Sequence, residues 1–259
     1  MPVEIERHLV LLGWGLARSL PLVWLVPAFG GPAVPVQARL ALGVALAGLC
    51  VPTLSGHLPT GLGLLWTVLL AREVLVGFAM GFICACWFRA AEAAGRLTDV
   101  LRGADFAGVI SPASGGRSSP FAALMLFVAV IVFLELGGIG QLAMALAHSY
   151  EAIPLTAGLR LEAQPHAAAT AAVMASARLF EATLGLCAPI VVSLLLADLA
   201  LGFMGRAVPQ MSIYSLGAPL KALLAIGVFL LGLGGIHAAM QRSLGGFLAI
   251  LRAATHLGH

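Results

Sequence analysis

Six apolar runs, interrupted or bounded by proline, glycine and charge, constrain the fold of this chain more than any other feature. Hydrophobic residues make up 61% of its 259 residues and charged residues only 10%. This is more apolar surface than one soluble core can bury. The sequence therefore predicts an all-α, polytopic membrane-type protein built of helical hairpins. The runs cover residues 9–29, 40–54, 62–88, 121–147, 179–204 and 216–236.

The third run shows that these segments are not simple lipid-facing spans. Residues 62–83 contain 12 Leu, Val, Ile and Phe residues, which favour insertion by about 4 to 7 kcal/mol in total. Arg72 and Glu73 lie in the middle and oppose insertion by about 5 to 7 kcal/mol. The two contributions nearly cancel, so we expect this segment to face protein or water for part of its length.

Ionisable residues inside or at the edges of the apolar runs allow two interpretations. They either pair with one another or with neighbouring chains, because an unpaired charge in hydrocarbon is unfavourable. Alternatively, Glu73, Glu135 and Asp198 form a proton or ion relay of a secondary transporter of ions or small solutes. The seven residues are Arg18, Arg72, Glu73, Glu135, Glu181, Asp198 and Lys221.

Small residues recur every four positions at Gly77, Gly81 and Ala85. On a helix this spacing places them on one face, where another helix can approach closely. The pattern is equally compatible with packing inside this chain and with packing against a partner subunit.

Several functional classes are disfavoured by the sequence. The formal charge of +3 is spread along the chain without the basic clusters typical of nucleic-acid binding. The four cysteines lie inside apolar segments and are interpreted as packing residues, and no histidine pair has metal-ligand spacing. No P-loop, HExxH or GxSxG motif is present. We therefore expect no enzyme activity, no cofactor, no metal and no nucleic-acid partner.

Two polar interruptions stand out. Residues 89–120 continue first as a helix through AAEAAGRLTDVLRGAD and then become FAGVISPASGGRSSP, whose Gly, Ser and Pro content predicts a loop. Residues 198–221, DLALGFMGRAVPQMSIYSLGAPLK, place a basic, proline-containing turn between two apolar segments.

Five blocks of the chain, in matching order, resemble the FliR/SctT family (SpaR, YscT and HrcT) of type III protein-export gates. They are ARSLPLVWLVPAFGGPAVPVQARLALGVALA at 17–47, REVLVGFAMGF at 72–82, AGRLTDVLRGADFAGVISPASGGRSSP at 94–120, SYEAIPLTAG at 149–158, and the segment from 180 to 221 that ends in the sequence quoted above. The last block is the most specific.

The resemblance implies a single subunit, residues 1–259, in the bacterial inner membrane within the basal body of a type III secretion system. It implies assembly with FliP/SctR-type and FliQ/SctS-type gate subunits and contact with a FlhB/SctU-type switch protein. The assembly would give unfolded flagellar or virulence proteins a gated passage through the bilayer. Both flagellar and injectisome systems remain open.

The resemblance also implies roles for individual residues. The loop that plugs the closed pore maps to the second part of residues 89–120, where Arg117 stands at a position at which family members often carry an amide. The candidate plug residues are Phe106, Gly108, Ile110, Ser111, Pro112, Gly115, Gly116, Arg117 and Ser118. Candidate structural or subunit-contact residues are Arg72, Glu73, Gly77, Gly81, Asp198, Arg206, Pro209, Gln210 and Lys221.

Overall fold

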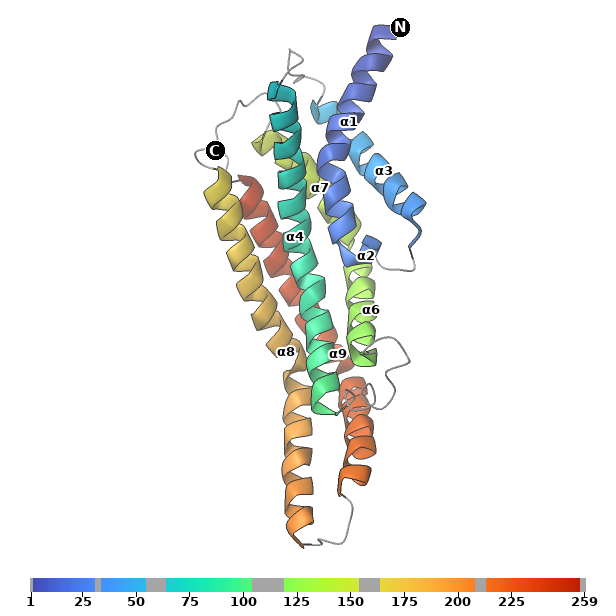
Figure 1. Cartoon of the computed structure of the whole chain (residues 1–259), viewed down its shortest axis with the longest axis vertical. Helices are drawn as coiled ribbons and strands as arrows, with labels where there is room; N and C mark the ends of the chain where they lie inside the picture. The colour runs from blue at the N-terminus through green and yellow to red at the C-terminus, as the bar shows by residue number, and fades with distance from the viewer. Residues whose placement is uncertain are drawn as a thin grey trace. The chain divides into compact units, whose positions relative to one another are not determined.

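The computed structural model describes residues 2–30, 34–54, 64–103, 119–153, 164–207 and 213–256, and within these ranges every regular element is a helix. This confirms the predicted all-α class (Figure 1). The helices are α1 (Pro2–Leu25), α2 (Pro27–Gly30), α3 (Val36–Leu54), α4 (Leu64–Leu101), α6 (Pro120–Glu135), α7 (Gly138–Ala152), α8 (Gln164–Ala207) and α9 (Ile213–His256).

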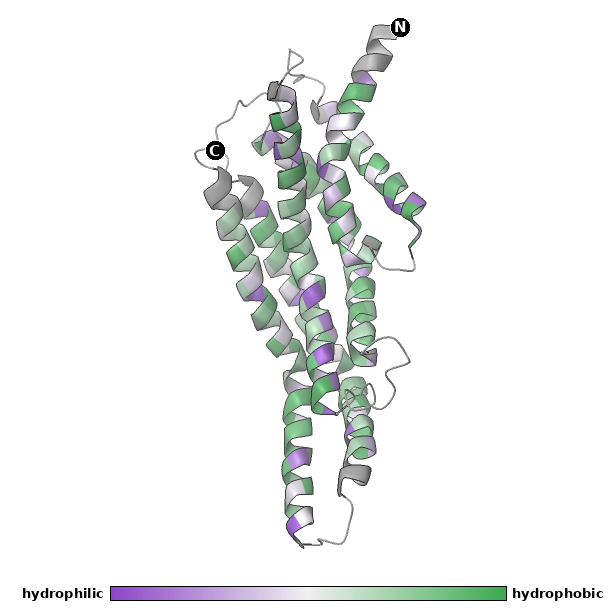
Figure 2. Cartoon of the chain, in the orientation of Figure 1, coloured by the Kyte–Doolittle hydropathy of each residue, from purple (hydrophilic) through white to green (hydrophobic). Residues whose placement is uncertain are grey.

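Within the described ranges, four helices are long and apolar enough to cross a membrane, or five spans if the bent pair α6 and α7 counts as one, as the predicted membrane-type architecture requires. Their apolar segments are His8–Leu25, Trp66–Leu101, Ala169–Ala207 and Gly217–Ala253. Helix α3 is apolar but shorter. Figure 2 shows that α6, α8 and α9 are hydrophobic over most of their length.

The apolar run at 121–147 is not one straight helix. Helices α6 and α7 meet at an angle of 68°, and the turn between them contains Gly137 with φ of +66°. Only glycine adopts this left-handed conformation without steric cost, so the bend is encoded locally. In contrast, the alanine-rich segment at 166–177 and the run at 179–204 form one continuous helix, α8.

The helices divide between two compact units. Unit 1 comprises Met1–Phe88, Phe133–Arg178 and Leu244–His259, and unit 2 comprises Arg89–Val132 and Leu179–Ser243. In unit 1, α1 packs on α3, and α3 also contacts α7. Trp87, Phe88 and Phe133 form its aromatic core, with ring centroids 4.9 to 6.4 Å apart.

Arg18 links three helices of unit 1 through a buried ion pair and further hydrogen bonds. Arg18 on α1 donates from Nε to Glu73 Oε2 on α4 at 2.7 Å, and both side chains are fully buried. Its Nη1 donates to Ser149 Oγ at 2.9 Å and its Nη2 to the carbonyl of Ile153 at 3.2 Å, both at the end of α7. The guanidinium also lies 3.9 Å from the centre of the Tyr150 ring. Arg18 thus satisfies its donors with groups far apart in sequence.

The small residues of α4 allow α1 to approach it closely. A Cβ atom added at Gly77 would lie 2.0 Å from the Arg18 carbonyl oxygen, and one at Gly81 would lie 3.0 Å from the Leu22 Cα atom. Ala85, on the same face of α4, is buried. Of the two interpretations of this stripe, the structure therefore shows packing within the chain.

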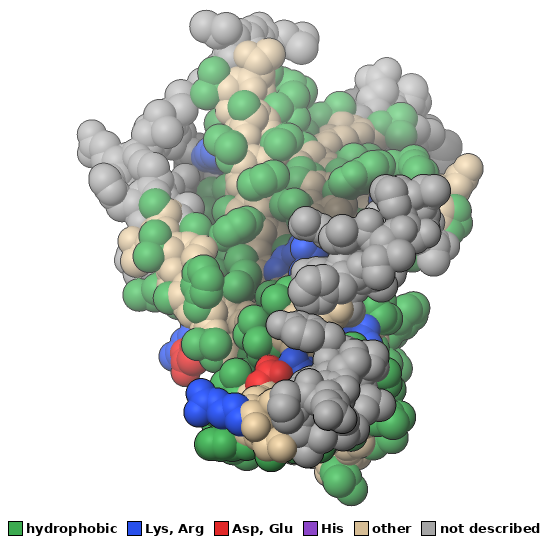
Figure 3. Space-filling view, turned by 60° about the horizontal axis from the view of Figure 1, so that its bottom comes forward, with side chains coloured by type: hydrophobic (Ala, Val, Ile, Leu, Met, Phe, Trp, Pro, Cys, Tyr) green, Lys and Arg blue, Asp and Glu red, His purple; other side chains and the backbone are tan. Residues whose placement is uncertain are grey.

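Unit 2 contains the hairpin formed by the adjoining parts of α8 and α9. Many large hydrophobic side chains on this hairpin are exposed, including Leu196, Phe203, Leu223 and Leu231, the last at 92%. The surface in view in Figure 3 is correspondingly mostly hydrophobic where it is described. These helices present apolar surface for lipid or for other protein chains.

Candidate functional site

The carboxylate of Asp99, in the last turn of α4, binds the start of α6. Its Oδ2 accepts hydrogen bonds from Ser119 Oγ at 2.8 Å, the Phe121 amide at 3.0 Å and the Ala122 amide at 3.3 Å. Its Oδ1 accepts from Arg102 Nε at 2.7 Å. Asp99 is only 2% exposed. We call Asp99, Arg102 and Ser119 the clasp; it joins the two helix ends that flank residues 104–118.

Local sequence explains both helix ends. Helix α4 stops at Leu101, and Gly103 follows with φ of +82°, the left-handed conformation that commonly ends a helix. Helix α6 begins at Pro120, and proline suits the first helical position because no amide donor is needed there. Helix α4 thus ends four residues before Asp105, the last residue of the helix predicted from the sequence.

The two helices cross closely just before the clasp. A Cβ atom added at Gly95 would lie 2.4 Å from the Phe121 carbonyl oxygen and 2.5 Å from the Ala122 Cα atom. Arg102 lies over the Phe121 ring at 5.4 Å, and that ring makes an edge contact with Phe229 of α9. The clasp is therefore supported by backbone packing as well as by charge.

Lys221, the only lysine of the chain, binds near the same end of α4. Its Nζ forms an ion pair with Asp198 of α8 and lies 3.4 Å from the carbonyl oxygen of Leu101. A cation at the carboxyl end of a helix interacts favourably with the helix dipole. Two residues of the predicted 198–221 block thus contact each other, and one of them, Lys221, also contacts the end of α4.

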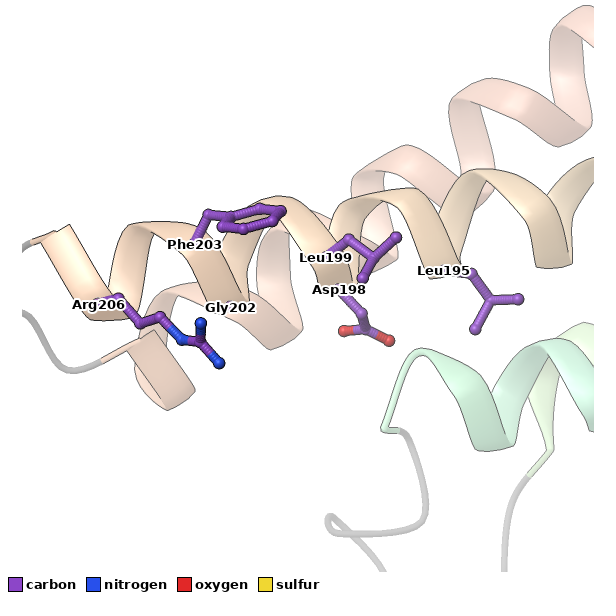
Figure 4. Close-up of a pocket in the computed structure, with 6 residues that line it drawn as sticks. All are labelled: Leu195, Asp198, Leu199, Gly202, Phe203 and Arg206. Atoms are coloured by element: carbon purple, nitrogen blue, oxygen red, sulfur yellow. The ribbon is translucent and has the colours of Figure 1, made fainter.

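One face of α8 borders an open hollow of about 610 Å³ (Figure 4). Leu195, Leu199 and Phe203 supply apolar surface, and Asp198 and Arg206 bring two charges to the same face on either side of Gly202. The side chain of Asp198 is 42% exposed even with Lys221 bound. The hollow combines apolar surface with accessible charge of both signs.

The model of a family described as "Bacterial export proteins, family 1" matches residues 9–246. The chain belongs to this family of export proteins. It is 30% identical to the flagellar biosynthetic protein FliR of Pectobacterium carotovorum over 85% of this chain and 82% of that protein. It is 29% identical to FliR of Escherichia coli over 84% of this chain and 81% of that protein. It is 28% identical to the secretion system apparatus protein SsaT of Salmonella typhimurium over 87% and 88%.

This family membership confirms the resemblance inferred from the five sequence blocks. The protein is therefore a membrane component of type III export systems. The relatives include flagellar and injectisome proteins at similar identity, so they do not separate the two branches. The organisation of the chain as one subunit with a plug loop stays a prediction.

The structure places some predicted site residues and leaves others undescribed. Glu73 pairs with Arg18 and, at 3.1 Å, with Arg72, while Asp198 pairs with Lys221. Two predicted contact residues, Pro209 and Gln210, lie outside the described residues. The same holds for all nine predicted plug residues: Phe106, Gly108, Ile110, Ser111, Pro112, Gly115, Gly116, Arg117 and Ser118.

The sequence interpretation did not single out Asp99 or Ser119. Two local signals point to them: Asp99 and Arg102 have the (i, i+3) spacing of a helical ion pair, and Ser119 precedes a proline at the start of an apolar run. Neither signal indicates that the acidic residue binds the amides of a different helix.

Proposed function

We propose that this chain forms part of the gated pore of a type III export apparatus and that residues 106–118 contribute the plug of the closed state. The clasp supports the proposal, because it fixes the described chain ends on both sides of this segment through one buried carboxylate. The plug would then begin and end at two helix ends that are joined to each other. The driving energy for export would come from other components.

The proposed partners are FliP/SctR-type and FliQ/SctS-type gate subunits and a FlhB/SctU-type switch protein, with unfolded secretion substrates in the pore. The proposed location is the bacterial inner membrane, within the basal body. Exposed apolar side chains on α8 and α9 support partners of this kind. A hollow that carries both an acidic and a basic side chain supports contact with protein at that position.

Shortening residues 106–118 is expected to raise the passage of ions through the assembled complex, because the segment would no longer fill the closed pore. The measurement is ion conductance of membranes that contain the complex, compared with the unaltered complex at equal abundance. A matched control removes residues 257–259 at the end of the chain. Equal conductance of the shortened and unaltered complexes would contradict the proposed plug.

The transporter alternative receives no support from Glu73 or Asp198, two of the three carboxylates on which it rests. Glu73 is bound by two arginines of unit 1, and Asp198 is bound by Lys221 in unit 2. Glu73 and Asp198 therefore each have a basic partner within their own unit, which is the arrangement expected of structural ion pairs.

A further inference from the structure

We infer that Asp99 is the positioning residue that sets the spacing between the end of α4 and the start of α6. The inference rests on the proposed function, because the spacing of these two helix ends would determine where the plug segment begins and ends. The groups that hold the two ends together are Asp99, Arg102, Ser119 and the first amides of α6.

Asp99 caps the amino end of α6, although it belongs to a different helix. The first amides of a helix lack partners within the helix, and a side-chain oxygen of the preceding residue normally accepts from them. Ser119 occupies that preceding position, yet its hydroxyl donates to Asp99 instead. The amides of Phe121 and Ala122 donate to the same carboxylate oxygen.

This arrangement joins two helices through a charge. A carboxylate at the amino end of a helix interacts favourably with the helix dipole, and hydrogen bonds to an ionised acceptor are stronger than neutral ones. A capping serine would stabilise α6 regardless of the position of α4. A carboxylate supplied by α4 stabilises α6 only while the two helix ends stay together.

Arg102 gives the carboxylate its compensating charge. Its guanidinium binds Oδ1 of Asp99 and lies against the Phe121 ring, and its side chain is only 15% exposed. A buried carboxylate is stable when it is both paired and hydrogen-bonded. All three bonds from α6 and Ser119 fall on Oδ2, so the two oxygens serve different partners.

The test is a distance measurement in the assembled complex. Spin labels at Val100 and Phe127, both exposed residues of unit 2, report the separation of the two helices. Replacing Asp99 with Asn keeps the shape but removes the charge, and it is expected to broaden the distance distribution; Asp99→Ala is expected to broaden it more. Glu92→Gln, which removes a carboxylate two turns earlier on the same helix, is the matched control and should leave it unchanged.

A second measurement separates this inference from the proposed function. Asp99→Asn is expected to raise ion conductance about tenfold, the change in an opening equilibrium when one charge-assisted hydrogen bond is lost. An unchanged distance distribution in both Asp99 variants would overturn the positioning role even if the shortened loop leaks. A broadened distribution with no leak from the shortened loop would retain the positioning role and refute the plug.

Discussion

Replacement of Glu73 by glutamine is expected to lower the free energy of unfolding of the protein by about 3 to 5 kcal/mol, the usual effect of removing one partner of a buried ion pair. Arg18 is fully buried and Arg72 is 12% exposed, so the change leaves two arginines without their shared carboxylate. The measurement is chemical denaturation of the purified assembly in mixed micelles.

Two further variants show whether charge is the cause. Glu92→Gln removes a carboxylate whose arginine partners are 60% and 63% exposed, and exposed pairs contribute only about 0 to 1 kcal/mol. Arg18→Met combined with Glu73→Met should recover part of the loss, because the two fully buried charges are both removed and only the partly exposed Arg72 loses its bond to the Glu73 carboxylate. A double variant as unstable as Glu73→Gln would argue against this explanation.

Replacement of Gly77 by alanine is expected to destabilise unit 1 at or above the upper end of the roughly 1 to 3 kcal/mol seen for overpacked cores. The added Cβ atom would lie 2.0 Å from the backbone oxygen of Arg18. A backbone atom cannot move aside as a flexible side chain does, so α1 and α4 must separate. This separation would also stretch the Arg18–Glu73 pair, and the two substitutions should therefore not be additive.

The control for this substitution is Gly227→Ala on α9, where an added Cβ atom meets nothing within 4 Å. Alanine favours a helix over glycine by about 1 kcal/mol, so this variant should be as stable as the parent or slightly more stable. Denaturation of the two variants under identical conditions provides the comparison. Equal stabilities would show that α1 and α4 do not need the close approach at Gly77.

The all-α class, the apolar segments and the family were predictable from the sequence because composition and ordered motifs carry that information locally. The insertion free energy of residues 62–83 is near zero because of Arg72 and Glu73, and this also correctly indicated a segment that needs protein contacts. The bend between α6 and α7 was less accessible, since Gly137 is one of 31 glycines and nothing in the sequence marks its positive φ.

The partners of the buried charges were not predictable, because they are set by tertiary packing. Arg18 binds Glu73 at a separation of 55 residues and Ser149 at 131 residues. Asp99 has a nearby basic partner in Arg102, which local spacing indicates, but its bonds to the amides of Phe121 and Ala122 cross 22 and 23 residues. A single sequence contains no signal that brings these groups together.

The clasp has a consequence for sequence change in this protein family. The clasp joins the helix ends at Gly103 and Ser119 directly, and 15 residues separate these two positions in the sequence. Because the bonds of Asp99 hold the two helix ends together, a change in the number of residues between these positions should leave both helix ends in place. Natural variants should differ in length here far more readily than they exchange the aspartate that fastens the ends.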